Sequence, residues 1–275
     1  IYNGINIRRI PIIPRKHSKF MLIANYISFV ISGALWSLFT TQKADIVFNF
    51  EVSPMSQALV GVWFSRKRKI PCHTYVTDLW PQNIIDVANV KNKFVINLIQ
   101  KMSDKIYKKS DTVLVSSSSF IQEIHSRNIP KSKIKYWPQY AEDFYFPVDK
   151  STSDFIIRYP SKLNLVFTGN IGFAQGLEIL IDVAKSLISE KIEFDIYIVG
   201  DGRYKETLAE KISTNKLNNF FVLVEKQPAE KIPNILSKCD AGLIILSKSK
   251  AFAKTIPAKT QSYLACGIPI LVCAD

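Results

Sequence analysis

The sequence has little with which to hold a metal ion or to form a disulfide. Its three histidines, His17, His73 and His125, lie far apart, and no Asp-x-Asp motif occurs. The four cysteines, at positions 72, 239, 266 and 273, include no closely spaced pair. These absences exclude the usual zinc-binding spacings and a disulfide framework. We therefore expect no metal site and no cofactor, and we expect buried thiols in a reducing compartment.

Motifs that read nucleic acid are also missing, although the formal net charge is +13. There is no zinc finger, no ribonucleoprotein-type aromatic motif and no basic heptad helix, so nucleic acid is not an expected partner. The positive charge is concentrated in residues 1–150, which carry a net +11, against +2 for residues 151–275. A solvated lysine-rich surface and contact with an anionic membrane surface both explain this asymmetry, and the two interpretations stay open.

The long apolar stretch Met21–Phe39 is interrupted by small and polar residues. These are Asn25, Ser28, Ser32, Gly33 and Ser37. Because a membrane-spanning helix needs about 20 predominantly apolar residues, the pattern favours a helix of a soluble domain over a spanning one. Its aromatic residues, Tyr26, Phe29 and Trp36, either contact a lipid surface or fill the core.

Short β-branched runs alternate with helical stretches along the chain, which is typical of parallel α/β structure. In the first half, the predicted strands are Ile46–Phe50, His73–Val76, Thr112–Ser116 and Ile134–Trp137. The helices predicted between them are Gln57–Ser65, Phe94–Lys109 and Ser119–Asn128. In the second half, the predicted strands are Leu163–Thr168, Phe194–Val199, Phe221–Val224, Ala241–Leu246 and Pro269–Val272. Near-continuous hydrophobic strands imply a sheet that is covered on both faces.

Two domains are expected. The polar segment Asp143–Pro160 is typical of a linker, and it puts the boundary near residue 150, between a domain of residues 1–150 and one of residues 151–275. Each half has the mixture of elements expected of one Rossmann-like domain. The chain starts at Ile1 rather than Met and stops at Asp275, directly after an apolar run, so we expect both domains to be truncated.

Ligands of doubly wound sheets bind beyond the carboxyl ends of the strands, so the loops after the strands are the candidate site. The loop after Leu163–Thr168 contains Gly169, Gly172 and Gly176 and leads into a predicted helix, Leu177–Lys191. Glycines let the backbone approach a ligand, and free N–H groups at a helix start favour a phosphate. The spacing matches neither the dinucleotide fingerprint nor the P-loop. Packing alone is the alternative interpretation.

Later loops carry further candidates. Gly200 and Gly202 follow the second strand of this half, where they form either part of a site or merely a tight turn. Pro257 and Gly267 are typical of the first turn and the C-terminal stop of a helix. That helix begins beside a lysine cluster, which would suit a diphosphate.

An ordered set of motifs in the second half resembles the nucleotide-binding domain of family-4 GT-B glycosyltransferases. The motifs are FTGNIGFAQGLE, YIVGDG, CDAGLIIL and IPAKTQSYLACGIPIL. In the first half, the SPMSQ turn, DLWPQN and YWPQYAEDFYFP resemble the WbuB-like branch, which contains transferases of O-antigen, lipopolysaccharide and capsule assembly. The resemblance implies a GT-B fold: two Rossmann-like domains that face a cleft, with the acceptor on the N-terminal domain and the nucleotide sugar on the C-terminal one.

The resemblance also implies the reaction and its partners. It implies a transferase that retains the anomeric configuration and works at the cytoplasmic face of the bacterial membrane. The expected donor is a nucleotide-diphosphate sugar, with weak preference for a UDP-linked N-acetylated amino sugar. The expected acceptor is a saccharide linked to polyprenyl diphosphate.

Two departures from the family affect the donor site. Many members carry two glutamates in the last motif, where this chain has Lys254 and Ser262. Members also often have Arg and Lys in the first loop, where this chain has Asn170 and Gln175. We interpret both departures as traits of the branch rather than as loss of activity.

The candidate replacements for the missing positive charge are Lys226, Lys254 and Lys259. Lys226 and Lys259 are the predicted catalytic cations, which would stabilise the leaving diphosphate without a metal. Gln261 can donate to a sugar hydroxyl or to a phosphate. The predicted donor-binding residues are Gly169, Asn170, Gly172, Gln175, Gly200, Gly202, Lys254, Pro257, Gln261 and Ser262.

On the acceptor side, Asp78 follows the strand His73–Val76, sits beside Trp80 and is the predicted catalytic residue. Ser53 and Trp80 are the other predicted acceptor-side residues. Alternatively, Asp78 caps a turn and Trp80 fills the core rather than stacking on a sugar. Two other functions stay open: a nucleotide-sugar epimerase of the same fold, and a non-catalytic subunit that binds nucleotide sugar.

Overall fold

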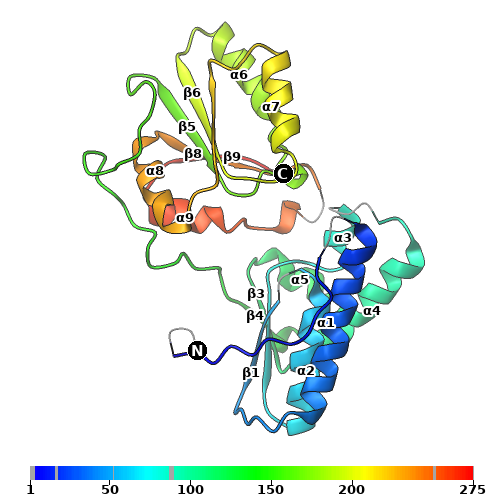
Figure 1. Cartoon of the computed structure of the whole chain (residues 1–275). Coiled ribbons are helices and arrows are strands. Elements are labelled where there is room, and N and C mark those ends of the chain that lie inside the picture. The colour runs from blue at the N-terminus through cyan, green and yellow to red at the C-terminus, as the bar shows by residue number, and fades with distance from the viewer. Residues whose placement is uncertain (1–3, 16–17, 52, 87–89, 250–251, 275) are drawn as a thin grey trace. The chain divides into compact units, whose positions relative to one another are not determined.

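The computed structural model describes residues 4–15, 18–51, 53–86, 90–249 and 252–274. The chain divides into two compact units, residues 1–138 and 139–275 (Figure 1). Each unit contains one parallel sheet, which confirms the predicted α/β class. The units divide between Pro138 and Gln139, earlier than the predicted boundary near residue 150. Residues 139–150 group with the second unit because Tyr145 packs against its core.

The first unit contains a four-stranded sheet in the order β1-β2-β3-β4. The strands are β1 (Val47–Glu51), β2 (Cys72–Val76), β3 (Thr112–Val115) and β4 (Ile134–Tyr136). The helices are α1 (Lys19–Phe39), α2 (Ala58–Arg68), α3 (Gln82–Asp86), α4 (Lys93–Lys109) and α5 (Ser119–His125), with 3-10 turns at Met55–Gln57 and Lys131–Lys133. Side chains of α2, α4 and α5 form one core with the strands, so these helices cover one face of the sheet.

The opposite face of this sheet carries a cluster of aromatic side chains. The ring centroid of Phe48 lies 5.9 Å from that of Trp137. The ring centroid of Tyr75 lies 5.5 Å from that of Phe50 and 5.8 Å from that of Trp137. Tyr75 is buried, while the other three are about half exposed. Within the described residues, this face of the sheet is therefore less covered than the face that carries α2, α4 and α5.

The second unit contains a five-stranded sheet in the order β7-β6-β5-β8-β9. The strands are β5 (Leu163–Thr168), β6 (Phe194–Val199), β7 (Phe221–Val224), β8 (Ala241–Ile245) and β9 (Ile270–Cys273). The helices are α6 (Ile179–Ser189), α7 (Lys205–Thr214), α8 (Ile232–Lys238) and α9 (Lys259–Ala265), with 3-10 turns at Phe173–Gln175, Ala229–Lys231 and Phe252–Lys254. The order along the sheet reverses beside β5, and a ligand crevice is expected beyond the carboxyl ends of the strands at such a point.

Both faces of this second sheet are covered. Helices α6 and α7 lie on one face, and α8 and α9 lie on the other (Figure 1). The side chains of each pair of helices form a core with the strands. All six residues of β6 are buried, as expected for a strand between two helical layers. This double covering explains why the strands of this unit read as continuous hydrophobic runs.

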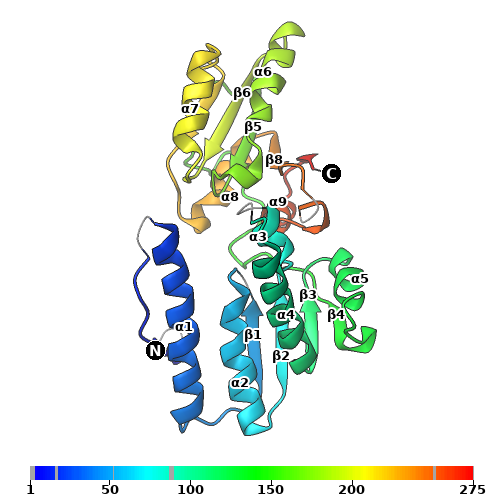
Figure 2. The same ribbon diagram turned by 90° about the vertical axis from the view of Figure 1, so that its right-hand side faces the viewer.

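Helix α1 packs alongside α2 through one side only (Figure 2). Trp36 stacks on Phe64, with ring centroids 5.3 Å apart, so it lies on the packed side rather than facing solvent. Residues 20–39 are long and apolar enough to cross a membrane, and 17% of this stretch is buried. The exposed side is a stripe of Ile23, Ile27, Ile31, Leu35 and Leu38. A lipid contact of α1 would therefore involve this aliphatic stripe and not Trp36.

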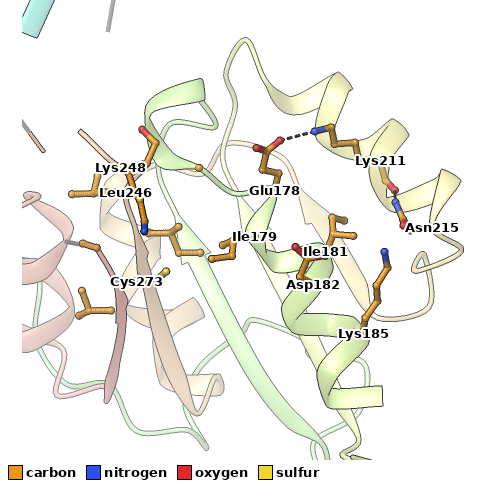
Figure 3. A pocket seen from close by; sticks show the side chains of 15 residues that line it. Glu178, Ile179, Ile181, Asp182, Lys185, Lys211, Asn215, Leu246, Lys248 and Cys273 are labelled. Atoms are coloured by element: carbon orange, nitrogen blue, oxygen red, sulfur yellow. Dashed lines mark hydrogen bonds and ion pairs between the residues drawn. The ribbon is translucent and has the colours of Figure 1, made fainter. Parts of the chain in front are cut away.

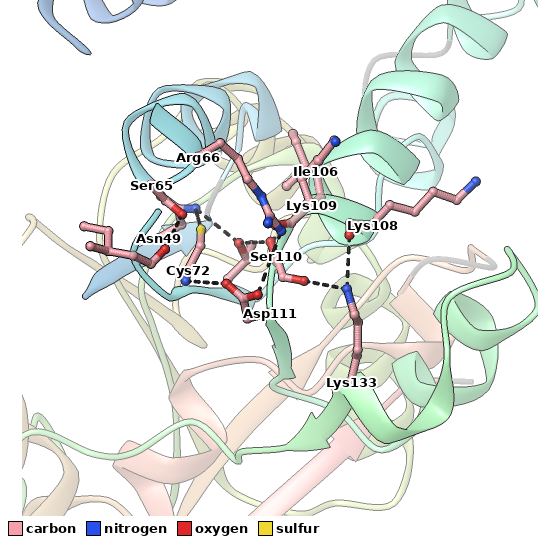
Figure 4. A network of polar contacts seen from close by, with 12 residues as sticks. Asn49, Ser65, Arg66, Cys72, Ile106, Lys108, Lys109, Ser110, Asp111 and Lys133 are labelled. Atoms are coloured by element: carbon pink, nitrogen blue, oxygen red, sulfur yellow. Dashed lines mark hydrogen bonds and ion pairs between the residues drawn. The ribbon is translucent and has the colours of Figure 1, made fainter. Parts of the chain in front are cut away.

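A polar network joins the amino ends of β2 and β3 (Figure 4). The carboxylate of Asp111 accepts the backbone N–H of Cys72 at 2.8 Å. Lys133 donates to the backbone carbonyls of Lys108 and Ser110 at 3.1 and 2.9 Å. Because ligands of such sheets bind at the opposite, carboxyl ends of the strands, we assign this network to the stability of the sheet.

The thiols are not all buried as predicted. Cys72 and Cys239 are buried, Cys266 is partly buried and Cys273 is exposed.

Candidate functional site

A cavity of about 840 Å³ lies in the second unit beyond the carboxyl ends of β5, β6 and β7. It brings together most of the predicted donor-binding residues and both predicted catalytic lysines. Those that line it are Gly169, Asn170, Gln175, Gly200, Gly202, Lys226, Pro257, Lys259 and Ser262. They come from four separate loops and from α9, so the parallel strands gather them as expected.

Glycines form part of the cavity wall because two loops pack there backbone against backbone. Gly200 has a φ of +152°, and a Cβ on it would lie 1.9 Å from the carbonyl oxygen of Gly169. Gly202 has a φ of +157°, and its Cβ would lie 2.2 Å from the carbonyl oxygen of Ile171. Neither position has room for a side chain. The Gly-Asp-Gly segment is therefore a close packing site rather than merely a tight turn.

The helix that follows the glycine-rich loop after β5 begins later than predicted. Residues 173–175 form a 3-10 turn, and α6 begins only at Ile179. Gly176, Glu178 and Ile179 line a different cavity, so the start of α6 is not part of this one. The loop contributes Gly169, Asn170 and Gln175 to the cavity instead. The backbone N–H groups of Gly169 and Gln175 are already bonded to the carbonyls of Val199 and Gly172.

Gly172 supports the loop without lining the cavity. A Cβ at this position would lie 2.6 Å from Nδ2 of Asn170 and 3.1 Å from Oε1 of Gln175. A larger residue would therefore displace both of these side chains, which do line the cavity.

Helix α9 is fixed against the end of β5 by Tyr263, a residue that the sequence pattern did not single out. Its hydroxyl accepts the backbone N–H of Thr168 at 2.9 Å and lies 3.1 Å from the Thr168 hydroxyl. The ring packs on Gly242, where a Cβ would lie 2.6 Å from it. Tyr263 is one helical turn after Lys259, so the contact also sets where Lys259 lies.

Lys259 has a buried amine with no counter-ion among the described residues. Its Nζ is shielded from solvent and has no hydrogen-bond partner in the described part of the chain. It lies 3.5 Å from the centroid of the Phe167 ring. Burial lowers the pKa of Lys259 from its ordinary 10.5 to about 7.

The segment that follows Pro138 completes one wall. Gln139, Tyr140, Glu142 and Tyr145 line the cavity, and the hydroxyl of Tyr145 is hydrogen-bonded to Ser262. The YWPQYAEDFYFP motif pointed to this stretch only through its resemblance to a branch of the family.

Two predicted donor residues on and before α9 lie outside the cavity lining. The amide of Gln261, with its nitrogen placed to donate, binds the carbonyls of Pro257 and Ala258 at 3.1 Å, so it is turned to its own helix and not to a ligand. Lys254 lies in the preceding 3-10 turn and does not line the cavity either.

In the first unit, the structure brings Ser53 and Asp78 together beyond β1 and β2. The Ser53 hydroxyl donates to the Asp78 carboxylate at 2.7 Å and accepts from the Asn83 amide at 3.2 Å. Trp80 is 7% exposed and packs in the core, so it offers no face on which a sugar could stack. The core interpretation of Trp80 is therefore the correct one.

Glu51, at the end of β1, was not singled out from the sequence. It is fully buried, and neither carboxyl oxygen has a hydrogen-bond partner among the described residues. Burial, and next the negative charge of Asp78, raise the pKa of Glu51 well above 4.5. A pattern of alternating polar and aromatic residues in β1 gives no signal that this carboxyl is buried.

A second, slightly larger cavity of about 940 Å³ lies in the same unit between α6, α7 and the ends of β8 and β9 (Figure 3). Its ion pair joins Glu178 and Lys211 at 2.5 Å, and their side chains are 60% and 44% exposed. Its other ionisable residues, Asp182, Lys185 and Lys248, are exposed as well. Charges in contact with water bind anions weakly, so the cavity with Lys259 is the better candidate site.

The sequence of residues 162–274 matches the family described as Glycosyl transferases group 1. Two curated proteins are similar to the chain. It is 24% identical over 266 residues to the "Probable glycosyltransferase WbjE" of Pseudomonas aeruginosa, covering 93% of this chain and 64% of that protein. It is 27% identical over 173 residues to the "Putative colanic acid biosynthesis glycosyl transferase WcaI" of Escherichia coli K12, covering 60% of this chain and 41% of that protein.

Solved structures confirm the fold. Anabaena Alr3699/HepE in complex with UDP and glucose has a TM-score of 0.63 and 14% identity, covering 94% of this chain and 65% of that one. Sucrose-phosphate synthase from Thermosynechococcus elongatus has a TM-score of 0.65 and 13% identity, covering 94% of this chain and 62% of that one. The chain has the GT-B fold, and the predicted resemblance to family-4 GT-B glycosyltransferases is confirmed.

Glu51→Gln should stabilise the protein at pH 8 and not at pH 4. Between pH 4.5 and its raised folded-state pKa, Glu51 is protonated when folded and ionised when unfolded, so the wild type loses stability as the pH rises through this window. Glutamine does not ionise, so the variant keeps its stability in this window. We expect its free energy of unfolding at pH 8 to exceed that of the wild type by at least about 1 kcal/mol. Urea unfolding at both pH values measures it, with Glu190→Gln, an exposed site, as the control. An equal effect of Glu51→Gln at both pH values would contradict a protonated Glu51.

Proposed function

We propose that this chain, whose residues 162–274 form a group 1 glycosyl transferase domain, acts as a glycosyltransferase in the synthesis of a bacterial surface polysaccharide. The observation that carries the proposal is the cavity that contains Lys259, which lies in that domain at the ligand-binding edge of its sheet. The names of the two curated relatives support the same activity. The chain spans 64% of the length of WbjE, so the activity of the whole protein is part of the proposal.

The proposed donor is a nucleotide-diphosphate sugar, and specifically a UDP-linked N-acetylated amino sugar. The backbone around Gly169 and Gly200 gives a diphosphate close access, and Lys226 and Lys259 supply positive charge. The hydroxyls of Tyr145 and Ser262, which are hydrogen-bonded to each other, line the cavity, and a ribose or sugar hydroxyl would compete for these bonds. The UDP held by the solved Anabaena neighbour supports a uridine nucleotide.

The proposed reaction retains the anomeric configuration. The bond between the anomeric carbon and the diphosphate oxygen breaks, and the acceptor hydroxyl forms a new bond to the same face of that carbon. The hydroxyl proton passes to the departing diphosphate. Lys226 and Lys259 stabilise the negative charge that develops on the leaving group, which is the main electrostatic task in such a transfer.

The proposed acceptor is a saccharide linked to polyprenyl diphosphate, bound by the first unit. Asp78 is the proposed acceptor-side residue, because its carboxylate already accepts a hydrogen bond from a hydroxyl, that of Ser53. A sugar hydroxyl that entered this position would present the same chemistry to Asp78.

Such an acceptor lies at a membrane, and the charge of the chain favours docking on an anionic surface at the cytoplasmic face. The first unit carries 20 Lys and Arg against 7 Asp and Glu, whereas the second unit carries 16 of each. Arg8 and Arg9 are exposed. The cluster at residues 66–68 is less available, because Arg66, Lys67 and Arg68 donate to backbone carbonyls at the ends of α1 and α4. Lys16 and the side chain of Lys19 lie outside the described residues.

An epimerase of the same fold and a non-catalytic binding subunit are the alternatives. The absence of the glutamate pair at Lys254 and Ser262 favours the second of these. The three functions differ in one measurement: a transferase releases free nucleotide diphosphate only when the acceptor is present. Mass spectrometry of the products from a panel of nucleotide sugars would identify the donor.

Gly172→Val and Lys259→Ala should each weaken the binding of UDP by about tenfold or more, because valine displaces Asn170 and Gln175 and alanine removes a buried cation. Calorimetric titration measures the affinity. Lys185→Ala is the control, since this exposed lysine lines the other cavity. Unchanged affinity in both variants would place the nucleotide elsewhere.

Transfer activity should persist in excess EDTA. The sequence has no Asp-x-Asp motif to hold a divalent cation, and lysines can stabilise the leaving diphosphate instead. The release of nucleotide diphosphate with and without the chelator measures this. Activity that disappears with EDTA and returns with magnesium or manganese would show that the reaction needs a metal.

The protein should sediment with vesicles that contain phosphatidylglycerol at low salt, and less with neutral vesicles or at high salt. A basic residue near an anionic surface contributes on the order of 1 kcal/mol, so reversing Arg8 and Arg9 to Glu should weaken binding at least about tenfold. Reversal of Lys185 and Lys231 in the second unit is the control, with little effect expected. Equal binding to both vesicle types would rule out electrostatic docking.

A further inference from the structure

Lys259 combines two properties that conflict in an empty site. Its amine lines the cavity proposed for a diphosphate, where a positive charge is useful. Yet the same amine is buried above the ring of Phe167 and has no hydrogen-bond partner in the part of the chain that is described. A buried charge is normally paired, or the group gives up its charge. In the free protein, burial without a partner therefore favours the neutral form of this amine.

The groups around Lys259 do not resolve the conflict. The acids that line the cavity are Glu142 and Asp201, and the other cation is Lys226. Asp201 accepts the N–H of Gly202 at 2.8 Å. Tyr140 and Tyr145 line the cavity too, and on α9 the hydroxyl of Tyr263 is bonded to Thr168. Burial alone accounts for the lowered pKa of Lys259, with no contribution from a charged neighbour.

The position of the amine suits an anion at one particular place. Nζ lies 3.6 Å from the point that a Cβ on Gly169 would occupy. The missing side chain of Gly169 leaves that space open, beside the backbone that joins the loops after β5 and β6. A phosphate oxygen at this point would be the first counter-charge within reach of the amine.

On the basis of the proposed function, we infer that Lys259 is an uncharged amine in the empty site at pH 8 and takes up a proton from solvent when the diphosphate of a nucleotide enters. The amine then donates to a phosphate oxygen as an ammonium group. Binding and protonation are thus one linked event, and the site recognises the ligand by a charge that it acquires only in the complex.

The linkage fixes the direction of the pH dependence. A site that takes up one proton on binding loses affinity as the pH rises, by about tenfold per pH unit where the free amine is neutral and the bound amine is charged. Below pH 7 the free amine is itself charged, so the uptake and the pH dependence disappear.

Calorimetric titration of the whole chain tests the inference. UDP and, separately, inorganic pyrophosphate are titrated at pH 8 and pH 6 in buffers with different enthalpies of ionisation. The dependence of the observed heat on the buffer gives the number of protons taken up. We expect about one proton at pH 8 and close to none at pH 6.

Two variants separate Lys259 from the rest of the cavity. Lys259→Arg keeps a charge that cannot titrate in this range, so it should bind without proton uptake and with little pH dependence. Lys226→Met removes the exposed cation of the same cavity and should keep the uptake. Where Lys259→Arg does not fold, by circular dichroism, NMR of ¹³C-methylated lysines in the wild type replaces it, since one lysine signal should titrate near pH 7 and move to higher pH with UDP.

The outcomes distinguish this inference from the proposed function. Binding of UDP at pH 8 without proton uptake, or uptake that persists in Lys259→Arg, would overturn the inference and leave the nucleotide site standing. Uptake with pyrophosphate but no binding of UDP would support the inference for phosphate and count against the nucleotide. Binding of neither ligand would overturn both.

Discussion

The candidate site depends on the contact that holds α9 against the end of β5. The Tyr263 hydroxyl accepts the backbone N–H of Thr168, as the carbonyl of a neighbouring strand otherwise would. Gly242 of β8 has no side chain and leaves room for the tyrosine ring. Because Lys259 precedes Tyr263 by one helical turn, the same contact puts its amine above Phe167, the residue before Thr168. One buried tyrosine thus joins the packing of the second unit to the electrostatics of its cavity.

The strands of the second unit could be predicted closely, since a strand covered on both faces is a hydrophobic run with sharp ends. Leu163–Thr168, Phe194–Val199 and Phe221–Val224 match the structure at both ends. Ends of helices were less accurate: Gln57 belongs to a 3-10 turn, and α6 begins at Ile179 and not at Leu177. Such ends depend on caps and tertiary contacts, which a hydrophobic pattern does not encode.

For the site, the sequence indicated which loops converge but not which side chains face the cavity. Nine predicted residues line it, because they follow parallel strands whose carboxyl ends meet at one edge. Gln261 was misplaced because its orientation depends on local hydrogen bonds to the carbonyls three and four residues earlier, which no sequence spacing reveals. Trp80 shows the same limit, since it is buried in a core formed with residues of α2, α4 and α5 that are distant in the sequence. The burial of Glu51 likewise has no signal in the pattern of β1.

Position 259 is occupied by a lysine, whose charge can change, rather than by an arginine, whose charge cannot. The first loop has Asn170 and Gln175 where members of the family often have Arg and Lys, so the loop itself adds no charge to the cavity. An arginine in place of Lys259 would stay charged in the empty site, where burial without a partner is costly. A lysine can be neutral there and charged beside a phosphate. The cavity can therefore be buried enough to strengthen an ion pair and still be stable when no ligand is bound.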